Sequence, residues 1–208
     1  MNERVVGASR AGRPIVARER GGPGGLLVFG AIHGDEPASA QLCARLAAAA
    51  PDGPPLAVVP VANPDGLARG QKDNAAGVDL NRNFPARSWR LEHPPGYDPG
   101  PRPLSEPESA ALAELVEARR PTVIVAVHQP LACVNWDGPA ASLAEAMAAR
   151  AALPPRPSVG YPTPGSFGAW AGIDRGLRVI TLELAGVVDD AALARAHAAL
   201  LVALEASR

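Results

Sequence analysis

Two histidines and two glutamates in this chain stand at the ends of apolar segments, where they could gather around one metal ion. His33 and Glu36 come directly after the apolar run at 26–32. His128 ends a second apolar run, and Glu183 lies near the end of a third. Imidazole nitrogens and carboxylate oxygens suit zinc, and a catalytic zinc site has three protein ligands and a fourth position for water. The pattern therefore predicts a site for one zinc ion, with a further glutamate as the base of a hydrolytic reaction.

Short apolar runs that alternate with helical stretches must position these side chains. Buried strands are predicted at 26–32, 56–61, 123–128 and 178–184, after a hairpin at 4–18. Helices are predicted at about 37–50, 105–119, 139–152 and 189–206, the second of them opening with a capping box at 105–108. This order predicts an α/β fold over residues 1–208, a single domain whose mixed, largely parallel β-sheet is flanked by helices on both faces. The polar strand ends then meet at one edge of the sheet, where such folds bind ligands.

A long irregular stretch at 62–104 holds the densest polar motif of the chain, Asp79-Leu80-Asn81-Arg82-Asn83-Phe84-Pro85. Loops of this length in a compact domain usually carry function. From the residues alone, Asp79 is expected to cap its own loop. Arg82 could bind a carboxylate through its planar fork, or it could form a structural ion pair with Asp65 or Asp79. The residues after His128, up to the next helix, are predicted to form a loop.

Composition argues against several classes of protein. The 208 residues carry a formal net charge of -1, which gives no reason to expect nucleic acid or an anionic membrane as a partner. No apolar run approaches the roughly 20 residues that span a bilayer, and the first residues lack the apolar core of a secretory signal. The expected compartment is the cytoplasm, and the expected partner is a small molecule or peptide.

These motifs together resemble the zinc carboxypeptidase family, and within it the short murein peptide amidase branch. The resemblance rests, in chain order, on His33-x-x-Glu36, Asn63-Pro64-Asp65-Gly66, the motif at 79–85, His128 and Glu183, and it spans nearly the whole chain. It implies that one zinc ion is held by His33, Glu36 and His128. It also implies that Glu183 acts first as general base and then as general acid.

The resemblance further implies residues that bind the substrate and the transition state. Asn81 and Arg82 would grip a terminal carboxylate of the substrate, and Tyr161 would correspond to a mobile substrate-binding tyrosine. Family members commonly have an arginine two residues before the position of Asn74, where it stabilises the oxyanion. In this chain that residue is Lys72, a point charge in place of a planar fork. Either Lys72 takes this role or Arg69 reaches in from the same loop.

The implied activity is that of a zinc-dependent metallocarboxypeptidase or amidase that hydrolyses an amide next to a free carboxylate. The murein branch implies the γ-D-glutamyl–meso-diaminopimelate bond of small murein peptides, and a role in peptidoglycan recycling. A pocket for diaminopimelate should contain an acid and a base, for which Asp137, Asp174, Arg175 and Arg178 are available. Two alternatives stay open: a hydrolase of N-acyl amino acids of the aspartoacylase or succinylglutamate desuccinylase type, and a catalytically weak peptide-binding module.

Overall fold

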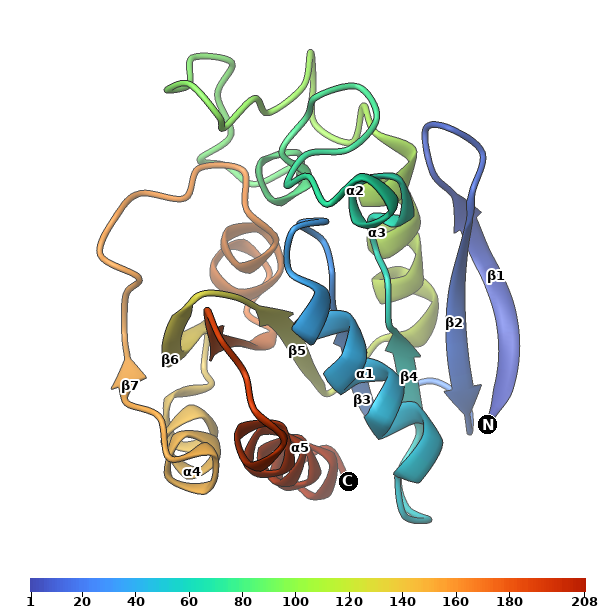
Figure 1. Ribbon diagram of the computed structural model, residues 1–208, viewed down its shortest axis with the longest axis vertical. Coiled ribbons are helices and arrows are strands. Elements are labelled where there is room, and N and C mark those ends of the chain that lie inside the picture. Colours follow the sequence, from blue (N-terminus) through green and yellow to red (C-terminus); the bar gives the residue numbers. More distant parts are fainter.

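The computed structural model describes residues 1–208 and has an eight-stranded sheet with helices on both of its faces (Figure 1). The strands are β1 (Asn2–Ala8), β2 (Pro14–Arg20), β3 (Leu26–Phe29), β4 (Leu56–Val59), β5 (Val123–His128), β6 (Leu131–Asp137), β7 (Pro155–Arg156) and β8 (Arg178–Ala185). Their order in the sheet is β1-β2-β4-β3-β5-β8-β6-β7. The central strands β4, β3, β5 and β8 are parallel, whereas β1, β2 and β6 pair in antiparallel fashion. The predicted fold class is confirmed.

The helical elements form two layers. They are α1 (Pro37–Ala49), α2 (Pro64–Arg69), η1 (Leu80–Arg82), α3 (Pro107–Arg119), α4 (Ala141–Ala151), η2 (Gly168–Asp174) and α5 (Asp190–Glu205). Leu26 and Val28 of β3 belong to a core under α1, α4 and α5, whereas Leu27 and Phe29 belong to a second core under α3 and η2. Because both faces of the central strands are covered, these strands are continuous apolar runs without a polar face.

The parallel strands bring their carboxyl ends to one edge of the sheet. The register pairs Phe29 of β3 with Ala126 of β5, and His128 of β5 with Glu183 of β8. The segment between α2 and α3 and the segment before η2, green and orange in Figure 1, lie at the same end of the molecule. This edge, covered by two irregular segments, is where the candidate site lies.

Three local expectations were wrong. Residues 131–137 form the strand β6, because they pair with β8 and pack against both α4 and η2. The segment after Asn63 begins the helix α2, with the Asn63 side chain accepting a hydrogen bond from the nitrogen of Gly66 at 2.8 Å. The capping box before α3 does not form, because the Glu108 carboxylate instead accepts from the nitrogen of Arg10 at 2.9 Å and from Asn74 at 3.2 Å.

No helix in this structure combines the length and the apolar character needed to cross a bilayer.

Candidate metal centre and active site

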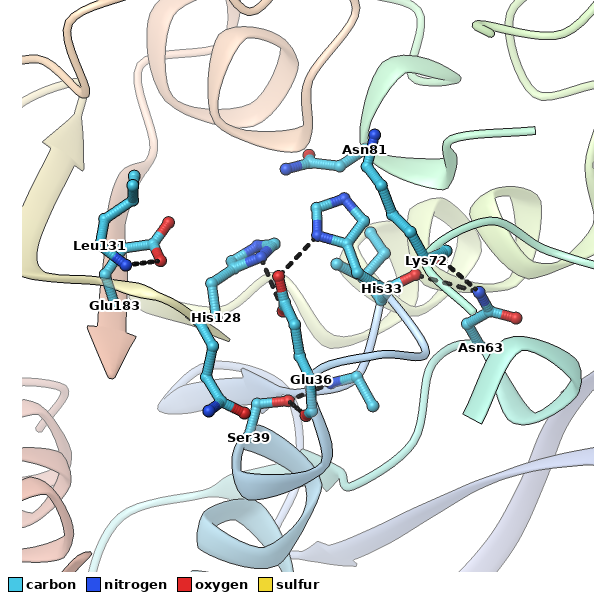
Figure 2. A network of polar contacts seen from close by, with 12 residues as sticks. His33, Glu36, Ser39, Asn63, Lys72, Asn81, His128, Leu131 and Glu183 are labelled. Carbon is cyan, nitrogen blue, oxygen red and sulfur yellow. Dashed lines mark hydrogen bonds and ion pairs between the residues drawn. The ribbon is translucent and has the colours of Figure 1, made fainter. Parts of the chain in front are cut away.

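His33, Glu36 and His128 converge on one point at the edge of the sheet (Figure 2). His33 lies just after β3, Glu36 caps the start of α1, and His128 is the last residue of β5. The Nδ1 atom of His33 is 2.8 Å from Oε1 of Glu36, and the Nδ1 atom of His128 is 3.2 Å from Oε2. One donor atom from each residue lies within 4.8 Å of the others, which is close enough for all three to bind a single ion.

The turn that carries His33 and Glu36 is held by hydrogen bonds on both sides. The Ser39 hydroxyl donates to the carbonyl of Glu36 at 2.6 Å and accepts from the nitrogen of Ala31 at 2.8 Å. From the other side, the Asn63 amide donates to the carbonyls of Ile32 and Lys72. These contacts fix the direction of the two side chains before any ion is bound.

Asp79 contacts the ring nitrogen of His33 that faces away from Glu36. Its Oδ1 atom is 3.2 Å from Nε2 of His33 and also accepts from the nitrogen of Asn81 at 2.9 Å. Asp79 therefore caps its own loop as expected, and it also orients the imidazole, which the sequence did not indicate. Burial lowers the pKa of His33, but hydrogen bonds with Asp79 and Glu36 outweigh this effect and raise the pKa to about 10. A carboxylate on the far ring nitrogen is the usual partner of a metal-binding histidine.

The surroundings of Glu36 indicate whether this set of residues fits a metal ion. Its side chain is buried, and no hydrogen bond reaches Oε2, although His128 lies 3.2 Å away. Burial raises the pKa of Glu36, but the two neighbouring imidazoles outweigh this effect and lower the pKa to about 2. A buried carboxylate oxygen without a hydrogen-bond donor is costly, and an ion bound between the three side chains would satisfy it. The donor set and its geometry fit a divalent ion of the zinc type.

Glu183 lies beside this centre, on β8 directly across from His128 (Figure 2). Its Oε2 atom is 3.4 Å from the nitrogen of Leu131, its one hydrogen-bond donor. Burial raises the pKa of Glu183, and His128 opposes this effect without cancelling it. A carboxylate whose pKa is raised by a partly apolar site is a better proton acceptor than one in water.

The residues predicted for the site from the sequence line one cavity of about 560 Å³. Its lining includes all eight of them: His33, Glu36, Lys72, Asn81, Arg82, His128, Tyr161 and Glu183. They come from segments more than a hundred residues apart, so the fold alone brings them together. A smaller hollow of about 280 Å³ adjoins this cavity and shares Arg82 and Tyr161 with it; the exposed His93 lines only the smaller one.

Arg82 is free to bind an anion in the cavity. Its guanidinium donates to the carbonyl of Asn81 at 2.6 Å and forms no ion pair with Asp65 or Asp79, so the structural ion-pair alternative was wrong. The carbon at the centre of the guanidinium lies 5.1 Å from the centroid of the Tyr97 ring. Tyr97 was missed in the sequence, because a tyrosine in a Gly- and Pro-rich loop carries no motif that marks it.

Of the two candidates for the oxyanion role, Lys72 lines the cavity. Its ammonium donates to Oδ2 of Asp79 and to the carbonyl of Gly96, both at 2.6 Å, and lies 4.1 Å from the centroid of Tyr97. Arg69, the alternative for the same role, is exposed at the end of α2 and does not line the cavity. Lys72 and His33 therefore share the carboxylate of Asp79.

Comparison with known proteins points to zinc peptidases, as the geometry of the site does. The zinc carboxypeptidase family matches residues 55–142. The chain is 38% identical over 192 residues to murein peptide amidase A of Escherichia coli strain K12, covering 86% of this chain and 76% of the relative. It is also 39% identical over 74 residues to gamma-D-glutamyl-L-diamino acid endopeptidase 1 of Lysinibacillus sphaericus, covering 32% of this chain and 18% of that protein.

A solved structure extends this similarity to the whole fold. The crystal structure of murein-tripeptide amidase from Escherichia coli O157 superimposes with a TM-score of 0.80 at 32% identity. The match covers 98% of this chain and 90% of that one, so nearly every element described above has a counterpart. The resemblance inferred from the motifs is thereby confirmed, and the chain belongs to the zinc carboxypeptidase family of metallopeptidases.

Proposed function

We propose that this metallopeptidase hydrolyses the γ-D-glutamyl–meso-diaminopimelate bond of small murein peptides, using one zinc ion. The observation that carries the proposal is the convergence of His33, Glu36 and His128 beside Glu183 in one cavity. The substrate is supported by two relatives, one named a murein peptide amidase and the other a gamma-D-glutamyl-L-diamino acid endopeptidase. We further propose that residues 1–208 act as one catalytic domain in the cytoplasm, in peptidoglycan recycling.

His33, Glu36 and His128 would hold the ion, and Asp79 orients the His33 ring for that role. Bound zinc supplies Lewis-acid polarisation of the scissile carbonyl and lowers the pKa of its water towards roughly 7. Glu183 accepts the proton of the attacking water at its carboxylate and then delivers it to the leaving amine. The position of Glu183 across from His128 supports this role, because the carboxylate reaches the same corner of the cavity.

Cations and amides in the cavity orient the substrate. Arg82 and Asn81 bind the free carboxylate next to the scissile bond, which fixes the amide in the same cavity as Glu183. Lys72 directs its ammonium toward the carbonyl oxygen as negative charge develops there. Tyr161, which is half exposed in the segment before η2, covers the bound substrate.

A product assay with zinc-loaded protein tests the proposal. The tripeptide L-Ala-γ-D-Glu-meso-diaminopimelate is expected to release diaminopimelate, measured by mass spectrometry. Glu183→Gln is expected to lower kcat by a factor of about 100 to 10,000 while retaining zinc. Lys72→Met, which loses the charge and keeps the length, is expected to lower kcat by about 100-fold or more. Zinc content of each variant, measured by atomic emission, separates lost chemistry from lost metal.

Three results would overturn the proposal in different ways. Deacylation of N-acetylaspartate without cleavage of the tripeptide would replace the peptidase by an acylase. Tight binding of the tripeptide without turnover would make the protein a binding module. Full activity after removal of zinc with a chelator would exclude the metal from the reaction.

A further inference from the structure

Lys72, the proposed oxyanion cation, is held from three sides. Its ammonium donates to Oδ2 of Asp79 and to the carbonyl of Gly96, both at 2.6 Å, and lies 4.1 Å from the centroid of the Tyr97 ring. A lysine ammonium has three N–H groups, and the attraction of the charge to an aromatic face uses none of them. The chain therefore uses two of the N–H groups, and the third is left for an oxygen in the cavity that Lys72 lines.

The Tyr97 ring lies close to a second cation of the cavity. The central carbon of the Arg82 guanidinium is 5.1 Å from the same ring centroid. Both cations thus lie within the roughly 6 Å over which the face of an aromatic ring attracts a positive charge. The guanidinium also donates to the carbonyl of Asn81, directly before it in the chain. That hydrogen bond stays within one segment, whereas Tyr97 gives the guanidinium a contact from a different part of the loop.

The backbone on both sides of Tyr97 is bound to the segment that carries Lys72 and Asp79. Gly96, directly before it, accepts from the ammonium of Lys72. The carbonyl of Asp98, directly after it, accepts from the nitrogen of Asp79 at 2.8 Å. Gly96 has a φ of +81°, a left-handed conformation that favours glycine. These contacts fix the ring at the boundary between the cavity and the smaller hollow, because Tyr97 lines both.

The flexibility of lysine explains why a third contact matters. Four carbons separate its ammonium from the backbone, and each of them adds a rotatable bond. Hydrogen bonds to Asp79 and Gly96 alone leave the ammonium free to move around the line that joins the two acceptor oxygens. The ring removes this freedom, because it attracts the charge toward one side of that line. A cation that is already in place stabilises developing negative charge without the cost of reorganisation.

We infer that Tyr97 is a positioning residue for the hydrolytic reaction, whose ring holds the ammonium of Lys72 and the guanidinium of Arg82 in the arrangement that the substrate needs. This inference rests on the proposed function, in which Lys72 stabilises the oxyanion and Arg82 binds the free carboxylate. A short chain of covalent bonds joins the scissile carbonyl to that carboxylate, so their separation in the substrate is nearly fixed. One ring in contact with both cations matches their positions to this separation. Loss of the ring therefore affects kcat through Lys72 and KM through Arg82.

Substitutions of Tyr97 test the inference with L-Ala-γ-D-Glu-meso-diaminopimelate as the substrate. Tyr97→Phe keeps the aromatic face, so kcat and KM are expected within about twofold of the wild type. Tyr97→Leu keeps an apolar side chain without that face, and is expected to lower kcat about 10-fold and to raise KM about 10-fold. Tyr97→Gln, which also lacks a ring, is a second variant with the same expected result. Zinc content and melting temperature should match the wild type in all three, because Tyr97 is partly exposed and is not one of the three metal-site residues.

A double variant tests whether Tyr97 acts on kcat through Lys72. In the Lys72→Met background, Tyr97→Leu is expected to leave kcat unchanged within about twofold, while KM still rises about 10-fold through Arg82. A general structural role would instead lower kcat by the same factor in both backgrounds. His93→Leu is the matched control and should leave kcat and KM unchanged. It removes a ring of the same loop that lines only the smaller hollow.

The results separate failure of the inference from failure of the proposed function. Wild-type kinetics in Tyr97→Leu and Tyr97→Gln, or an equal loss in Tyr97→Phe and Tyr97→Leu, would overturn the role of the ring and leave the amidase intact. An equal fall of kcat in the wild-type and Lys72→Met backgrounds would do the same. Full activity of Lys72→Met, or no cleavage of the tripeptide by zinc-loaded wild type, would overturn the proposed function, and the inference with it.

Discussion

Single residues in this site serve more than one neighbour, and Asp79 is the clearest case. Its carboxylate holds the His33 ring, caps its own loop through the nitrogen of Asn81, and accepts the ammonium of Lys72. It is fully buried, and burial raises its pKa, but hydrogen bonding and charge from His33, with help from Arg82 and Lys72, outweigh this effect and lower the pKa well below its usual range. One carboxylate thus couples the position of His33 in the candidate metal centre to that of Lys72, the proposed oxyanion cation.

Asp79→Asn tests this coupling. The amide keeps the size of the side chain but removes the charge that faces His33, so the affinity for zinc is expected to fall by about 10- to 100-fold. Competition with a chromogenic zinc chelator measures the affinity. Asp52→Asn, on an exposed loop, is the control and should bind zinc as the wild type does. An unchanged affinity in Asp79→Asn would mean that Asp79 only caps its loop.

Among the elements, the turn between β3 and α1 depends on close contact with α2. Gly34, inside this turn, packs so tightly that a Cβ atom would lie 2.0 Å from the carbonyl carbon of Gly66 and 2.3 Å from the nitrogen of Leu67. These neighbours are backbone atoms of α2 and cannot move aside as a side chain end could. Asn63 caps the start of the helix and its amide also holds the same turn, so α2 supports the turn that carries His33 and Glu36.

Gly34→Ala is expected to damage the site through this packing. The added methyl group must push the turn away from α2, so the free energy of unfolding should fall by about 1 to 3 kcal/mol, with weaker zinc binding. Urea unfolding and zinc competition measure the two effects. Gly22→Ala is the matched control, because a Cβ atom there meets nothing within 4 Å. Equal stability of the two variants would show that the turn is not held by α2.

Asp137 makes the stability of the whole molecule depend on pH. Because burial raises the pKa of Asp137, the native state holds that proton more tightly than the unfolded chain does. The stabilisation by this proton is complete below the unfolded pKa of about 3.9 and is lost as the pH rises through the native pKa. At neutral pH, an ionised Asp137 without a bound cation destabilises the fold.

Asp137→Asn is therefore expected to gain stability relative to the wild type as the pH rises. The difference in free energy of unfolding between variant and wild type should be larger at pH 8 than at pH 5. Urea unfolding at both pH values, with zinc present and no substrate, measures it. A difference that does not change with pH would mean that Asp137 is solvated in the native state.

Local order along the chain was enough to predict the main elements and the three residues that converge in the candidate metal centre. The buried parallel strands are continuous apolar runs, and a polar residue that ends such a run must lie at the edge of the sheet, as His128 does. The spacing of His33 and Glu36 within one turn is likewise a local property. These features depend on neighbouring residues, so the sequence alone determined them.

Tertiary structure decided what depends on partners far apart in the chain. Asp79 meets His33 across 46 positions, and β6 is a strand because β8 lies beside it. Of the four charged residues considered for the pocket, only Asp137 faces the cavity, since two glycines of η2 leave space for it. Non-local pairing and close packing leave no local periodicity, so composition and spacing could not reveal which of these residues would line the cavity.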